Sequence, residues 1–463
     1  MKHLLLPLVA IIFVICSLPC HAANLIEAYR DALQSDPTFK SAEAQKFAIQ
    51  QSEPIARGAF FPQVSAIGAA DRLHNDQTFG GTDNSFHQTI QRYALNANQI
   101  IFDYASWGRL QNAKAQVKQA QAAFNAAQQD LMIRLAGAYF SVLNAYDTLV
   151  STQAEKRSLA EQLRQTEEQF KVGLIAVTDV DQVRANHDIV AAREIAQQND
   201  VSDKLEGLRA ITGVFYKKLA AIKGSAPLIP PTPNNINEWV KVTEKQNYTL
   251  LAARFAAQAA KENIKIQSAG HYPVVGAEGS YSYTDQSATQ FFLTGTNSAQ
   301  TDRIAKVTVN AQLPIFSGGT VTAQTRQASY QYAQAVADMD FTYRSVLTKA
   351  REAFLGVISG ISKIKADKQA IASNQSSLNA TRAGYAVGTN TLLDVLIQQT
   401  ALYNAQTNFT TDQYTYLIDI LRLKQAAGIL SVQDLELMNT WLKDTIDLAN
   451  YYYDADITRP TPW

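Results

Sequence analysis

The side chains that could carry out catalysis are few, and their spacing fits no known catalytic or metal-binding motif. Beyond residue 22 the chain has four histidines, His74, His87, His187 and His271. It has no Gly-x-Ser-x-Gly elbow and no phosphate-cradling glycine loop. The two cysteines, Cys16 and Cys20, stand near the start, so the rest of the chain has no thiol chemistry. We therefore expect no catalytic residue, no cofactor and no metal centre.

Two similar motifs place an aspartate shortly after a glycine. FKVGLIAVTDV (170–180) and YAVGTNTLLDV (385–395) share Val-Gly and Asp-Val at the same spacing, 215 residues apart. Glycine suits the turn after a helix because it accepts a left-handed backbone, so each motif predicts a tip between two helices. Taken alone, each motif is a simple turn, and Asp179 and Asp394 are charges favourable to a helix N-terminus.

The repeat extends beyond these motifs. Phe61-Pro62 is matched by Tyr272-Pro273, and QIIF at 99–102 is matched by LPIF at 313–316, so the offset grows from 211 to 215. We interpret the chain as two halves, each with a short helix, two strands, a long helix, a break and a second helix.

Strands and helices are indicated by different periodicities. Residues 275–283 and 305–313 alternate apolar and polar side chains, and 92–98 do so more weakly, which predicts half-exposed strands. The intervening segments 73–86 and 285–302 are rich in Gly, Asn and Thr and are expected to be loops. No proline occurs between Pro62 and Pro227, so 107–170 could form one helix of roughly 95 Å.

The first 22 residues have the features of a secretory signal peptide: Lys2, an apolar run and small residues before cleavage after Ala22 or Ala23. A membrane anchor is disfavoured because the run is shorter than about 18 residues, and a lipoprotein site is disfavoured by Pro19. Without this leader, 40 basic residues face 41 acidic ones, so we expect no nucleic-acid partner.

The expected organisation has five parts. They are the signal peptide (1–22), the first structural repeat (23–225), a Pro-rich strap in an equatorial region (226–239), the second repeat (240–430) and a C-terminal equatorial tail (431–463).

Four strands per chain cannot close a membrane barrel, and open strand edges cannot face lipid. Two copies would give eight strands around a filled interior, whereas three would give twelve around a lumen, which the polar strand faces favour. The rival interpretation is an envelope structural coiled coil or adhesin, which explains the helices but not the alternating strands.

The two tip motifs, with LNAYDTL (143–149), NQIIFDYASW (98–107) and LPIFSGG (313–319), resemble those of the TolC-like outer-membrane efflux proteins over essentially the whole mature chain. The resemblance implies a mainly α, α+β homotrimer, with a 12-stranded outer-membrane β-barrel continued by a long periplasmic α-helical barrel. It implies a passive, gated exit duct for drugs or proteins in tripartite efflux pumps or type I secretion. The implied partners are a periplasmic adaptor, an inner-membrane pump or ABC exporter, and outer-membrane lipid.

The resemblance also assigns roles to individual residues. The implied adaptor-docking tips are Val172, Gly173, Leu174, Val387, Gly388 and Thr389. The implied tethers of the closed entrance are Gln162, Thr178, Asp179 and Tyr385. Asp394 matches the first aspartate of a ring at the constriction, where divalent cations are expected to block.

Two positions depart from the family pattern. Asn390 stands where family members have an arginine that bonds to the neighbouring protomer, and Ile397 replaces a second ring aspartate. An asparagine lacks the charge-assisted, forked contact of a guanidinium, so we expect the closed entrance to be held less firmly. With isoleucine in place of the second ring aspartate, we also expect a weaker divalent-ion block. Lys171 and Arg382 are the alternative cations that the sequence offers.

Overall fold

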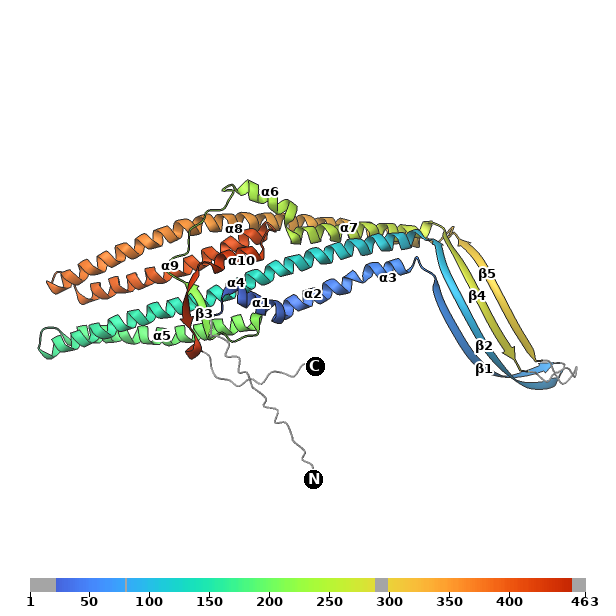
Figure 1. The fold of residues 1–463 in the computed structure, drawn as a ribbon, viewed down its shortest axis with the longest axis horizontal. Helices are drawn as coiled ribbons and strands as arrows, with labels where there is room; N and C mark the ends of the chain where they lie inside the picture. Colours follow the sequence, from blue (N-terminus) through green and yellow to red (C-terminus); the bar gives the residue numbers. More distant parts are fainter. Residues whose placement is uncertain (1–21, 80, 288–298, 452–463) are drawn as a thin grey trace, which may run out of the picture.

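The protein is elongated, with a helical part and a strand part at opposite ends (Figure 1). This computed structural model describes residues 22–79, 81–287 and 299–451. The predicted signal peptide, but for its last residue, and the end of the tail after residue 451 lie outside the described residues. Along the described chain the structure is mainly helical, and none of its helices there is both long and apolar enough to cross a membrane.

Two antiparallel helical hairpins form the body. They are α4 (Tyr104–Lys171) with α5 (Val177–Thr212), and α8 (Thr320–Ala386) with α9 (Leu392–Ala426). The helix predicted over 107–170 is confirmed, because α4 runs unbroken for 68 residues, or about 100 Å. Its N-terminus is capped by Asp103, whose carboxylate accepts from the amides of Ala105 and Ser106 at 2.9 and 3.1 Å.

Shorter helices complete the helical part, and α2, α3 and α7 run from it toward the strands (Figure 1). They are α1 (Leu25–Ser35), α2 (Pro37–Gln50), α3 (Ser52–Gly58), α6 (Ile236–Gln246), α7 (Tyr248–Ser268) and α10 (Val432–Asn439), with 3₁₀ turns η1 (Ala269–His271) and η2 (Ala449–Tyr451). Helices α2 and α7 both pack along α4. Helix α6 begins inside the predicted strap.

The strands form one antiparallel sheet in the order β1-β2-β4-β5. The bounds are β1 Gln63–Phe79, β2 Thr82–Phe102, β4 Val274–Gln286 and β5 Gln300–Gln312. The loop predicted at 73–86 is wrong, because β1 and β2 stay paired up to Phe79 opposite Thr82, with Gly81 at φ +84° between them. Ladder hydrogen bonds outweigh the loop-like composition there. Of the loop predicted at 285–302, residues 288–298 lie outside the described residues.

A second, two-stranded sheet pairs β3 (Lys218–Ile222) with β6 (Leu442–Asp447), which the sequence did not predict. The main core lies beneath it. Tyr139 of α4 is fully buried and donates to the Ala220 carbonyl of β3 at 2.6 Å. Tyr416 of α9 donates to the Ile229 carbonyl at 2.9 Å and accepts from the Ile229 amide at 2.7 Å, which fixes the strap against the helices.

Candidate functional site

The first hairpin turns at Gly173, which has φ +74°. The Gly173 amide donates to the Phe170 carbonyl at 2.9 Å, and the Leu174 amide donates to the Gln169 carbonyl at 3.0 Å. No atom lies within 4 Å of a Cβ built on Gly173, so backbone conformation alone requires glycine there. Val172 and Leu174 are 70% and 73% exposed, so this tip presents apolar side chains to solvent.

The second hairpin turns at Gly388 in the same way, with φ +78° and open space around a built Cβ. The Gly388 amide donates to the Tyr385 carbonyl at 3.1 Å. The amide and the hydroxyl of Thr389 both donate to the Gly384 carbonyl, at 2.8 and 3.0 Å. Val387 is exposed. The six residues predicted at the tips therefore do stand at hairpin tips, although their docking role stays a prediction.

Asp394 closes a capping box with Thr391 at the start of α9. Its carboxylate accepts from the amide and the hydroxyl of Thr391 at 2.9 and 2.8 Å, and its own amide donates to the Thr391 hydroxyl at 3.2 Å. The backbone hydrogen bond from Thr391, its hydroxyl and the Asn390 amide group hold the pKa of Asp394 below its usual range. The side chain is thus fixed and charged.

Asp179 stands at the equivalent place in α5 but lacks this support, because the N-cap there is Ala176, which has no capping side chain. Thr391 was not singled out in the sequence, although the T-x-x-D spacing before an apolar run is a signal that could have found it. The two tips therefore share a backbone turn and differ in how firmly the second helix begins.

Tyr385 connects the two hairpins. It packs beside a buried cluster that joins Leu159 and Val183 of the first hairpin to Leu392 of the second. Burial raises the pKa of Tyr385, and the nearby negative charge of Asp179 raises it further. Two of the four predicted tethering residues, Asp179 of the first hairpin and Tyr385 of the second, therefore lie close enough for the carboxylate charge to act on the phenol, without a hydrogen bond between them.

The other two predicted tethers, Gln162 and Thr178, both belong to the first hairpin. Gln162 is half-buried on α4, and its carbonyl accepts from the Thr166 hydroxyl at 2.7 Å. Thr178 is exposed in the first turn of α5. Among the residues that the structure describes, no hydrogen bond joins Gln162, Thr178 or Asp179 to Tyr385.

Asn390 folds over the end of α8. A Cβ built on Gly384 would overlap the Asn390 side-chain oxygen, and the Asn390 amide donates to the Gly384 carbonyl at 3.3 Å. Any larger residue at 384 would have to turn the exposed Asn390 side chain aside, a close approach that no sequence signal revealed. Ile397, on α9 after Asp394, is 53% exposed.

The two alternative cations are engaged within their own hairpins. Lys171 pairs with Glu168 at 2.9 Å on α4. The Arg382 guanidinium donates weakly to the Gln399 side chain at 3.5 Å, between α8 and α9.

Two neighbouring rows of side chains across the four-stranded sheet differ in character. The strand register aligns Ala66, Leu95, Tyr281 and Ala305 in one row across the sheet. The next row, on the opposite face, aligns Ser65, Asn96, Ser280 and Lys306. Because successive side chains alternate faces, these two rows lie on opposite faces of the sheet. Strands β1 and β5 are the two edges.

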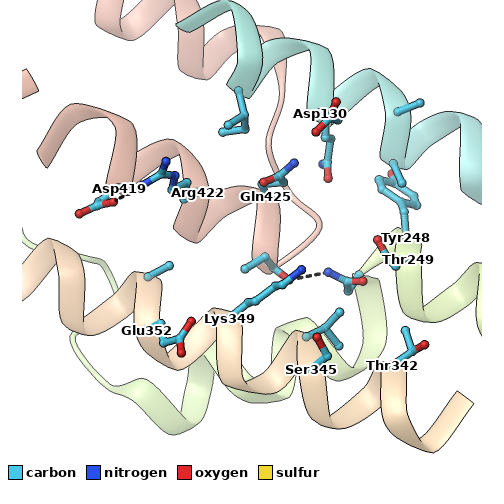
Figure 2. A pocket seen from close by; sticks show the side chains of 18 of the residues that line it. Asp130, Tyr248, Thr249, Thr342, Ser345, Lys349, Glu352, Asp419, Arg422 and Gln425 are labelled. Carbon is cyan, nitrogen blue, oxygen red and sulfur yellow. Dashed lines mark hydrogen bonds and ion pairs between the residues drawn. The ribbon is translucent and has the colours of Figure 1, made fainter. Parts of the chain in front are cut away.

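A cavity of about 820 Å³ lies in the helical body, between α4, α7, α8 and α9. Figure 2 shows Lys349 and Glu352 of α8 along one side and Asp419, Arg422 and Gln425 of α9 along another. Asp419 and Arg422 pair with each other at 3.2 Å. The lining has neither histidine nor cysteine, and it carries no nucleophile–base arrangement.

Long paired helices, an amphipathic sheet at one end and apolar tips at the other define an outer-membrane channel of the export type. The family model described as "Outer membrane efflux protein" matches residues 28–214 and 239–429. The Vibrio cholerae outer membrane protein TolC is 35% identical over 422 residues, covering 91% of this chain and 94% of that protein.

Two further comparisons agree. The protease secretion protein PrtF of Dickeya chrysanthemi is 27% identical over 91% of this chain and 92% of its own length. The crystal structure of the outer membrane protein VceC from Vibrio cholerae matches with a TM-score of 0.72 at 20% identity, covering 87% of this chain and 96% of that one.

The chain belongs to the outer membrane efflux protein family. It is an outer-membrane exit duct for efflux and type I secretion, its helical part extends into the periplasm, and it is not an enzyme. This outcome confirms the resemblance stated from the sequence and sets aside the structural coiled-coil interpretation.

Proposed function

We propose that three copies of this chain form the duct, each adding β1, β2, β4 and β5 to a twelve-stranded barrel. The two aligned rows of the sheet carry this proposal. An apolar row suits lipid and a polar row suits a watery lumen, while the open edges at β1 and β5 need partners. Two copies would close eight strands around a filled interior, whereas three leave a lumen.

The remaining segments have structural roles in this duct. We assign 1–22 to a cleaved signal peptide, and 23–225 and 240–430 to two repeats that alternate around the helical barrel. The strap (226–239) and the tail (431–463) form an equatorial belt. Two bonds between Tyr416 and Ile229 hold the strap against α9, and the pairing of β6 with β3 holds the tail against the end of the first repeat, which supports this assignment.

The hairpin tips close the periplasmic entrance in the resting state. Gln162, Thr178, Asp179 and Tyr385 tether the hairpins, and the effect of the Asp179 charge on Tyr385, across the two hairpins, supports this role. Asp394 from each copy forms the constriction ring and the site of divalent-ion block. Asn390 sets how firmly the entrance is held closed, and Ile397 sets the strength of the divalent-ion block.

The tips also dock a periplasmic adaptor that links the duct to an inner-membrane pump or ABC exporter. The docking residues are Val172, Gly173, Leu174, Val387, Gly388 and Thr389. Exposed apolar side chains on a preformed turn support this role, because they provide contact area without an ordering cost. The duct itself conducts its cargo, drugs or proteins, passively.

Export assays on glycine variants test this proposal. Gly173→Asp and Gly388→Asp place a charge at each tip, and we expect drug export to fall to the level of a deletion strain. Gly224→Asp is the matched control, because Gly224 also has a positive φ (+81°) and open space around a built Cβ but lies away from the tips. Backbone strain is therefore equal in the three variants.

Each variant is also assayed for a crosslinked trimer in outer-membrane fractions. Normal export by both tip variants, or equal loss in Gly224→Asp, contradicts docking at the tips. Crosslinking of the wild-type protein that stops at a dimer contradicts the twelve-stranded barrel.

A further inference from the structure

His74 and His87 face each other directly across β1 and β2. Their rings stack with centroids 4.3 Å apart and planes 20° from parallel, and both residues are exposed. They are thirteen positions apart in the sequence, with His74 inside the segment expected to be a loop (73–86) and His87 directly after it. The pairing of β1 with β2 brings the two histidines together, and neither has a role in the proposed duct.

The register places this pair on the same sheet face as the apolar row. Gly68 is opposite Tyr93, and the ring of Tyr93 lies 6.3 Å from that of Tyr283 on the same face. Tyrosines of this kind mark the membrane interface in barrels. His74 is six residues further along the strand from Gly68, or about 20 Å. In the proposed duct, the pair therefore stands in water beyond the apolar band.

The pair has the chemistry of a metal-binding site. Directly opposed side chains in an antiparallel pair have Cβ atoms about 4.5–5.5 Å apart. A turn of each ring about its χ2 torsion can bring one nitrogen of each imidazole to about 2.0–2.1 Å from a single ion. Asp76 lies two residues along from His74, and its carboxylate is 3.5 Å from His74 Nε2, where it can orient the ring or add an oxygen ligand.

We propose that His74 and His87 bind one divalent transition-metal ion, such as Cu²⁺ or Zn²⁺, at the end of the β1–β2 hairpin. Imidazole ligands favour these ions over Mg²⁺ and Ca²⁺, which take oxygen ligands. Across the described ranges no three ligand side chains form a ready metal cluster, so water completes the coordination and the ion exchanges readily.

The test uses the full-length channel in detergent, purified without a polyhistidine tag and titrated with Cu²⁺. We expect one ion per chain, and an electron paramagnetic resonance spectrum that shows two nitrogen ligands. His74→Asn and His87→Asn should each lower the affinity at least tenfold and remove one nitrogen. His187→Asn is the matched control, since His187 also contacts an aspartate, Asp188, at 3.1 Å, yet has no facing histidine.

Unchanged binding in His74→Asn and His87→Asn, equal loss in His187→Asn, or no Cu²⁺ binding overturns the proposal. A second variant, His74→Cys with His87→Cys, tests the register directly, because directly opposed cysteines should form a disulfide on oxidation. Lack of that disulfide also overturns it. Metal binding is measured on the purified protein and export is measured in cells. Absence of metal binding would therefore not contradict the proposed duct.

Discussion

Asn390 directs its side-chain oxygen onto Gly384, at the place where any other residue would carry its Cβ. Gly384→Ala should therefore turn the Asn390 side chain aside, lowering the local opening free energy of the second tip by about 1 kcal/mol, the size of one net hydrogen bond. The measurement is hydrogen exchange of the Thr389 and Asn390 amides, which donate to the Gly384 carbonyl. Gly137→Ala, in an open position on α4, is the control and should leave that exchange unchanged. Unaltered exchange in Gly384→Ala would show that the contact has no energetic role.

Asn390→Arg should tighten the closed entrance. A charge-assisted hydrogen bond contributes about 1.5–3 kcal/mol against about 1 kcal/mol for a neutral one, so we expect a lower closed-state conductance in planar bilayers. Asn379→Arg, on the exposed surface of α8, controls for the added charge alone. Equal closed-state conductance in Asn390→Arg and wild type would show that position 390 does not hold the entrance closed.

Ile397→Asp should strengthen divalent block from the periplasmic side. In a trimer it would raise the ring from three carboxylates to six, with a correspondingly stronger attraction for divalent ions. Ile397→Asn changes the size and polarity of the side chain much as Ile397→Asp does, but adds no charge. Divalent ions should therefore block this variant as they block the wild type. Identical block in Ile397→Asp and Ile397→Asn would exclude a role for charge at this position.

Divalent block by Asp394 should persist at acidic pH. The hydrogen bonds from Thr391 lower the pKa of Asp394, so its carboxylate stays charged below the usual titration range. A lowered folded-state pKa also means that the stability this group contributes is present above its unfolded pKa and is lost only as the pH falls through the lower folded value. Thr391→Val should move the loss of block to higher pH, while Thr391→Ser should not. Coincident pH profiles for Thr391→Val and wild type would contradict this account.

The large elements could be predicted because their signals are local and repeated. The absence of proline from 62 to 227 permitted α4, and glycine at 173 and 388 indicated turns that do have positive φ. Alternation in 275–283 and 305–313 located β4 and β5. The match of the family model confirms the class of protein that these patterns suggested.

What the sequence missed depends on contacts between distant residues. The pairing of β3 with β6 joins segments more than 200 residues apart, and neither strand is long enough to show a clear periodicity. The close approach at Gly384 arises only because Asn390 folds back on it. His74 and His87 become neighbours only through the register of a hairpin whose end resembles a loop in composition.

Single-channel recording in planar bilayers tests the gated duct most directly. Purified wild-type protein should give uniform, small conductance steps, because the tips close the entrance. The double variant Asp179→Ala with Tyr385→Phe should give larger steps, because it removes the electrostatic interaction and the hydroxyl group proposed to tether the two hairpins. Absence of conducting steps from the wild type, or steps of equal size in both proteins, would contradict a duct gated at these tips.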